Sequence, residues 1–234
     1  MTIQQPSQLS KYFAVVISLL SDRGGFMEEI EQGVRLESKI IALLVSSSFF
    51  FAIYGCIIGA FHSWMQAISS AIKLPALYLM TMIICLPTLY FFNILFGSRK
   101  SFTQHFAWVL TAVSITAVLL FSLAPVTLFF LITARHYHFF QLLNVAIFAL
   151  TGFVGVHLLY QGMQSMAKND GDGQEARKTL LQSWLVLYAF VGSQLGWTLR
   201  PFFGSPTMPF QLFREMEGNF YLSVFRSLIE IFTY

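Results

Sequence analysis

Three side chains near the C-terminal end of the chain have the types and spacing of a binding site. Gln194, Trp197 and Arg200 follow one another at steps of three residues, so in a helix they share one face. A guanidinium can hold a carboxylate or a phosphate through two parallel hydrogen bonds, and Lys cannot reproduce that fork of donors. These residues therefore predict a docking surface for a partner, or a site for an anion or a lipid head group, centred on Arg200.

An aromatic pair follows this face directly. Phe202 and Phe203 stand between Pro201 and the stretch 204–206, whose Gly and Pro predict a turn with little freedom to move. We interpret the pair as part of the same recognition surface. A purely structural interpretation also fits: a helix that stops at Arg200, with the Arg reaching water along its apolar stem and an aromatic residue at the membrane boundary.

The sequence offers little for catalysis or for a bound metal. None of the 11 Asp and Glu residues falls within a predicted membrane span, although proton-coupled transporters place such acids there. His136 and His138 have no neighbouring acid or Cys, while Cys56 and Cys85 both fall within spans, which argues against a metal site or a disulfide. Because the motifs of phosphate-binding loops, nucleophile elbows and zinc proteases are also missing, we expect a protein that is not an enzyme and has no cofactor and no metal.

The composition is that of a membrane protein. Hydrophobic residues make up 56% of the chain and charged residues 11%, with a mean hydropathy of +0.66, whereas a soluble domain has about 25% charged residues. The net charge of +3 is too small and too scattered for nucleic-acid binding and suits loops that face an anionic membrane surface. We therefore predict contact with the lipid bilayer and no nucleic-acid partner.

Five segments predict transmembrane helices, which makes the fold class an all-α, polytopic bundle. The clearest segment runs from Lys73 to Arg99 without a charge between the two; as a helix it is roughly 35 Å long, enough for a bilayer core of about 30 Å. We place Pro75 in its first turn and Pro87 mid-span, where it should bend the helix. The other predicted spans are 40–61, 107–133, 140–160 and 179–199.

These spans define three regions. Residues 1–39 form an amphipathic N-terminal region, 40–199 the five-span transmembrane domain and 200–234 the tail. Within the first region, 9–20 predicts a short helix lying on the membrane surface. In the tail, 218–234 predicts a second interfacial helix, or alternatively a sixth, partial span.

The segments between these elements are polar. Residues 26–39 predict a solvated amphipathic segment, 62–72 a short link between the first two spans, and 166–178 a linker whose Asn-Asp-Gly-Asp-Gly core cannot enter the membrane.

Two pairs of glycines predict close helix packing. Gly55 and Gly59 lie four residues apart in the first span, and Gly192 and Gly196 in the fifth. Small residues at this spacing let two helices approach closely in lipid, so we expect the first and fifth spans to pack together. The alternative is that the spacing arises by chance, because glycine is frequent in membrane helices in general.

The distribution of Lys and Arg predicts the orientation. Nine of them fall on the side of the N-terminus and five on the other side, three of these in the tail. Because cytoplasmic loops carry the excess of Lys and Arg, we expect a cytoplasmic N-terminus and an exoplasmic or lumenal C-terminus, in a bacterial inner membrane or an internal membrane.

The turn after the second span resembles a known family. Residues 95–104, LFGSRKSFTQ, are similar to the Gly-Ser-x-x-Ser-Phe-x-Gln-like turn of bacterial Yip1-like chains, which also carry a Pro in the next span, here Pro125. The likeness covers 40–195, whereas the tail from 196 to 206 departs from the family pattern. The resemblance implies five spans, a cytoplasmic N-terminal region and a non-enzymatic role in membrane organisation or trafficking.

Two functions follow from these observations. We expect a scaffold that organises membrane or binds a membrane-protein partner or a second copy of itself. The alternative is a small-solute channel or transporter, which requires polar side chains that converge on one cavity. The candidates for such a pathway are Ser46–Ser48, Asn93, Asn144, Gln182 and Gln194.

Overall fold

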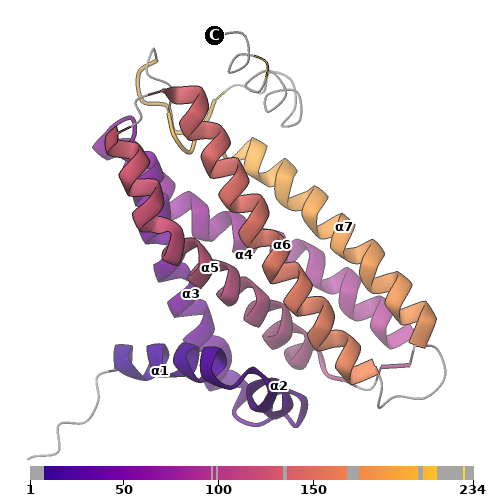
Figure 1. The fold of residues 1–234 in the computed structure, drawn as a ribbon. Coiled ribbons are helices and arrows are strands. Elements are labelled where there is room, and N and C mark those ends of the chain that lie inside the picture. The colour runs from indigo at the N-terminus through magenta and orange to yellow at the C-terminus, as the bar shows by residue number, and fades with distance from the viewer. Residues whose placement is uncertain are drawn as a thin grey trace, which may run out of the picture.

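The structure is a computed structural model that describes residues 8–95, 97–98, 100–133, 136–167, 174–204, 208–214 and 229. The predicted all-α class is confirmed (Figure 1). The helices of the described residues are α1 (Gln8–Ser21), α2 (Arg23–Glu31), α3 (Leu36–Gly59), α4 (Trp64–Leu95), α5 (Phe102–Thr133), α6 (Tyr137–Ala167) and α7 (Gln174–Thr198).

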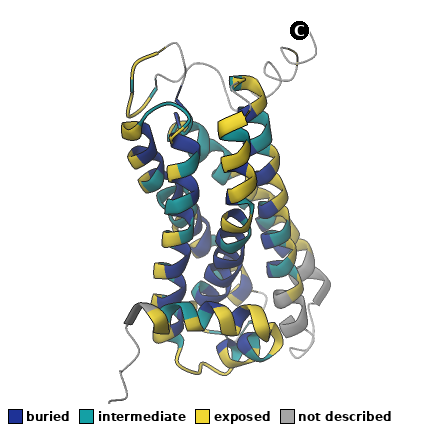
Figure 2. Cartoon of the chain, turned by 60° about the vertical axis from the view of Figure 1, so that its left-hand side comes forward, coloured by how far each residue is buried: buried dark blue, intermediate teal, exposed yellow. Residues whose placement is uncertain are grey.

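Four of these helices, α3 to α6, are long and apolar enough to cross a membrane. Their most apolar stretches have mean hydropathies of 1.8 to 2.5, yet only 28–39% of each stretch is buried within the protein. Many of the other apolar residues of these helices are exposed, and Figure 2 colours exposed positions yellow along the outside of the bundle. Only lipid can cover such apolar surface without cost. The chain is therefore a membrane protein.

The predicted fifth span, 179–199, coincides with α7, which is not among these four helices. Polar residues such as Gln182, Ser193 and Gln194 lower its hydropathy.

Helices α3 to α7 run along one another, and α1 and α2 lie across one end of the bundle (Figures 1 and 2). Helix α3 packs on α4 and α5, α6 packs on α5, and α7 packs on α4. Two large aromatic residues of α3, Phe51 and Tyr54, are fully buried at these contacts.

The charges of segment 26–39 led us to expect a single solvated stretch, and this prediction is wrong. The first part of the segment belongs to α2, which buries Phe26 and Ile30, and its last part is already the first turn of α3. Lys39 is buried there, with its ammonium 2.6 Å from Glu29 and 4.8 Å from the ring centre of Phe26. The charges that made the segment look solvated are partly used to hold α2 against the bundle.

Gly97, Ser101 and Gln104 shape the connection between α4 and α5. Gly97 has a positive φ of 83°, which glycine adopts without strain. The hydroxyl of Ser101 accepts from the backbone N–H of Gln104, whose side-chain oxygen accepts from the N–H of Ser101, a capping box that starts α5. The Gln104 amide also donates to the carbonyl of Glu31 at 2.7 Å, so one side chain joins the start of α5 to the end of α2.

Helix α4 begins at Trp64, nine residues before the predicted start of the second span, so the expected link 62–72 is wrong. Pro75 consequently lies inside the helix and not in its first turn. Gln66 and Ser70 fall within the expected link and Lys73 at the expected start of the span, but all three are buried in α4. They hydrogen-bond to the chain beyond α7, which explains why a membrane helix tolerates them.

The two glycine pairs do not face each other, so the expected packing of the first on the fifth span is wrong. A Cβ at Gly55 would lie 2.8 Å from the carbonyl carbon of Ser70, and one at Gly59 only 2.7 Å from the Cα of Ala67. Both contacts are with α4. Gly192 and Gly196 also face α4, at the looser distances of 3.5 and 4.0 Å from Thr81 and Leu77. Helix α4 therefore separates the two elements that were expected to meet.

Candidate functional site

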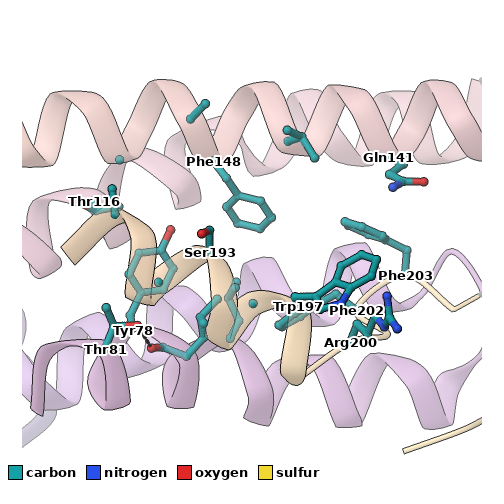
Figure 3. A pocket seen from close by; sticks show the side chains of 18 of the residues that line it. Tyr78, Thr81, Thr116, Gln141, Phe148, Ser193, Trp197, Arg200, Phe202 and Phe203 are labelled. Atoms are coloured by element: carbon teal, nitrogen blue, oxygen red, sulfur yellow. Dashed lines mark hydrogen bonds between the residues drawn. The ribbon is translucent and has the colours of Figure 1, made fainter. Parts of the chain in front are cut away.

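A cavity of about 1700 Å³ lies among α4, α5, α6, α7 and residues of the stretches 200–204 and 208–214 (Figure 3). Small residues on two of these helices leave the space open, because they carry little or no side chain to fill it: Ala149, Gly152, Ala189, Gly192 and Gly196. A Cβ at Gly152 would meet nothing within 4 Å. Most of the wall is apolar, with Leu77, Val113, Phe148 and Leu159 among its residues.

One end of the cavity is cationic. Arg200 and Arg214 are the only Lys, Arg, Asp or Glu residues among the described residues of its wall. The guanidinium carbon of Arg200 lies 3.5 Å from the ring centre of Trp197, and the backbone N–H of Arg214 donates to the carbonyl of Arg200 at 3.3 Å. The Arg214 side chain also interacts with the hydroxyl of Tyr137.

Side chains of α4 hold the segment that carries these arginines. Gln66 donates to the carbonyl of Pro201 and Ser70 to that of Phe202, each at 2.6 Å. The Lys73 ammonium donates to the carbonyls of Pro201 and Leu212. These bonds satisfy irregular backbone at the end of a membrane bundle, where an unpaired carbonyl is costly, and they fix where Arg200 and Arg214 stand.

The structure brings together most of the predicted recognition residues. Trp197, Arg200, Phe202 and Phe203 all line the cationic end of the cavity, whereas Gln194 is not among the described lining residues. The ring of Phe203 also packs edge-on against Phe140 of α6, with centroids 6.1 Å apart.

Sequence reasoning missed Arg214 and the supporting Lys73. Arg214 lies 14 positions beyond Arg200 in the sequence, and only the structure shows that their backbones are hydrogen-bonded to each other. Its flanking apolar residues, Phe210, Leu212 and Phe213, were a signal that this part of the tail returns to the membrane bundle.

The chain matches no family model, no curated protein and no solved structure. The site therefore has to be interpreted from its own geometry.

The side chains proposed for a solute pathway do not converge on this cavity. Asn93 donates to the carbonyl of Leu89 in its own helix, and Ser47 bonds to Leu44 in the same way. Asn144 accepts from the hydroxyl of Tyr54 at 2.8 Å, in a buried cluster that also includes Thr127. These groups join helices or satisfy backbone, and none of them lines the cavity as far as its described wall extends.

Helix α7 is fixed beside the cavity by its aromatic residues. The indole N–H of Trp184 donates to the carbonyl of Cys85 in α4 at 2.9 Å. One turn further along α7, Tyr188 lines the cavity, and its buried hydroxyl has no hydrogen-bond partner in the described part of the chain.

Among the described residues, no group of three or more His, Cys, Asp or Glu residues could hold a metal ion.

Proposed function

We propose that this protein binds a lipid-like molecule of the bilayer in the cavity between α6 and α7, without acting as an enzyme. The observation that supports the proposal is an apolar cavity of about 1700 Å³ bounded by membrane helices. Sites for small soluble ligands usually measure about 300–1,000 Å³, so this volume suits a larger, chain-like molecule.

The same helices offer a route for such a molecule. Helices α6 and α7 contact each other less than any other neighbouring pair that borders the cavity. We propose that α7 crosses the membrane as a fifth span and that the ligand enters sideways from lipid, between α6 and α7. A lipid-binding role also agrees with the membrane-organising function implied by the resemblance to the Yip1 family.

The orientation remains part of the proposal. With the N-terminus in the cytoplasm, α1 and α2 lie on the cytoplasmic side. Arg200 is held next to Gln66 at the start of α4, at the opposite end of the bundle, and therefore faces the exoplasmic or lumenal leaflet.

Lipid retention during purification tests the proposal. We expect the wild type, purified in mild detergent, to carry bound lipid that organic extraction and mass spectrometry detect. The double variant Ala149→Phe with Ala189→Phe places two rings in the cavity and should remove most of that lipid. Ala146→Phe is the matched control, because Ala146 is an exposed residue of the same helix that does not line the cavity.

Equal amounts of lipid bound to all three proteins would contradict the proposal. The melting temperature in detergent is measured for each protein. A variant that loses its lipid but melts as the wild type does is still folded, so its loss of lipid is not due to unfolding.

A further inference from the structure

We infer that the ligand is a membrane lipid with a compact anionic head group, a phosphate or a carboxylate, held between Arg200 and Arg214. This inference rests on the proposed lipid-binding function and specifies the ligand's chemistry and direction. The head group lies at the end of the cavity lined by residues of 200–204 and 208–214, and the apolar chain extends along α6 toward the α1–α2 end of the bundle.

The charge of the cavity wall is the first argument. Its described residues contribute two guanidinium groups and no carboxylate. The Nε of Arg214 is buried and has no hydrogen-bond partner among the described residues. A buried donor without an acceptor is costly, and an oxygen of an anionic head group supplies the acceptor that the Nε of Arg214 lacks.

The geometry of the two arginines is the second argument. The ring of Trp197 supports the guanidinium of Arg200 from one face at 3.5 Å, so the N–H groups at the edge of its plane are the ones that can grip an anion in two places. The backbone hydrogen bond from Arg214 to Arg200 keeps the second guanidinium on the same short segment. Four hydrogen bonds from Gln66, Ser70 and Lys73 anchor the carbonyls of Pro201, Phe202 and Leu212 before any ligand arrives.

The division of the cavity into two parts is the third argument. Figure 3 shows Gln141, Trp197, Arg200, Phe202 and Phe203 gathered at one end, and Tyr78, Thr81 and Thr116 at the other. The cavity borders α6 from Tyr137 to Leu159, a length of about 33 Å at 1.5 Å per residue. That length matches a bilayer core of about 30 Å. A lipid can therefore bind with its head at the arginines and its chain parallel to the chains of neighbouring lipids.

A competition experiment with head groups of different charge tests the inference. The purified protein in detergent is loaded with a fluorescent phospholipid, which is then displaced by phosphatidic acid, phosphatidylcholine or diacylglycerol with identical acyl chains. We expect the dissociation constant of phosphatidic acid to be at least about tenfold lower than that of diacylglycerol, because diacylglycerol has no phosphate to accept charge-assisted hydrogen bonds from the two arginines. Arg200→Gln and Arg214→Gln should each abolish most of this preference. Arg23→Gln, at an exposed position of α2, should keep it.

The outcomes separate the inference from the proposed function. Equal affinity for phosphatidic acid and diacylglycerol in the wild type, together with loss of both in Ala149→Phe/Ala189→Phe, would overturn the inference while the protein remains a lipid binder. Displacement by inorganic phosphate at the same concentration as phosphatidic acid would assign the arginines to a soluble anion instead. Failure of every lipid to bind, with no effect of the two Phe substitutions, would refute the proposed function itself.

Discussion

The guanidinium of Arg200 is stacked on the indole ring of Trp197, with 3.5 Å between its central carbon and the ring centre. The two residues are three positions apart, but Trp197 belongs to α7 and Arg200 lies just beyond its end. The contact thus forms where the helix stops, and it directs an Arg that could have reached water toward the wall of a membrane cavity.

Replacing this Arg by Lys separates an anchor from a binding site. An Arg that only reaches water along its stem tolerates Lys, whereas two-point binding of a phosphate does not. We expect Arg200→Lys to insert and express normally and to bind phosphatidic acid several-fold more weakly, and Arg200→Ala to bind it weaker still. Membrane fractionation and lipid competition measure the two properties. If both variants bind all lipids as the wild type does, Arg200 is only part of a helix stop.

The glycines of α3 and α7 should differ sharply in their tolerance of a methyl group. A Cβ at Gly59 would collide with the backbone of α4 at Ala67, which cannot move aside as a side chain can. We expect Gly59→Ala to cost roughly 1–3 kcal/mol from overpacking. Gly192→Ala is the control, because its Cβ would lie at an ordinary 3.5 Å from Thr81. Thermal unfolding in detergent compares them, and equal melting temperatures would show that α3 and α4 are not in close contact.

The contact between α2 and α5 should depend on Gln104. Gln104→Leu removes the capping bond to Ser101 and the bonds to the carbonyls of Ile30 and Glu31, and a lost cap costs about 1 kcal/mol. We expect faster amide hydrogen exchange in α2 and in the first turn of α5. Thr103→Ala, at the exposed neighbouring position, is the control and should leave exchange unchanged. Unaltered exchange in Gln104→Leu would mean that α2 is held by its buried apolar residues alone.

The number of spans can be tested at the end of the chain. If α7 crosses the membrane and the N-terminus is cytoplasmic, a reporter enzyme fused after Tyr234 will lie outside the cytoplasm, and its activity will be found only there. A second fusion after Ala167, at the end of α6, should show cytoplasmic activity. Cytoplasmic activity of both fusions would mean either that α7 does not cross or that residues 218–234 cross as well. These two cases are separated by a third fusion placed after Gly204.

The membrane character and the approximate positions of the four long apolar helices followed from the sequence alone, although α4 begins nine residues earlier than predicted. Long uncharged segments have only one stable environment, because a helix in lipid satisfies its own backbone and hides its apolar surface at the same time. The end of α7 before Arg200-Pro201 also followed from local chemistry, since Pro cannot continue the hydrogen bonding of a helix. The core of the linker at 168–173 and nearly all of 218–234 lie outside the described residues, so the predictions made for them stay predictions.

Only the tertiary structure decided which faces meet. A membrane helix is apolar on all sides, so hydropathy has no period that marks the buried face, and a pair of glycines indicates a close approach without naming the partner. Gly55 and Gly192 were therefore assigned to each other although both face α4. The role of Lys73 in holding the chain beyond α7 was not visible in the sequence, because its partners, the carbonyls of Pro201 and Leu212, lie far away along the chain. The cavity itself depends on how α4, α5, α6 and α7 are placed relative to one another, a relationship between four helices that no single segment encodes.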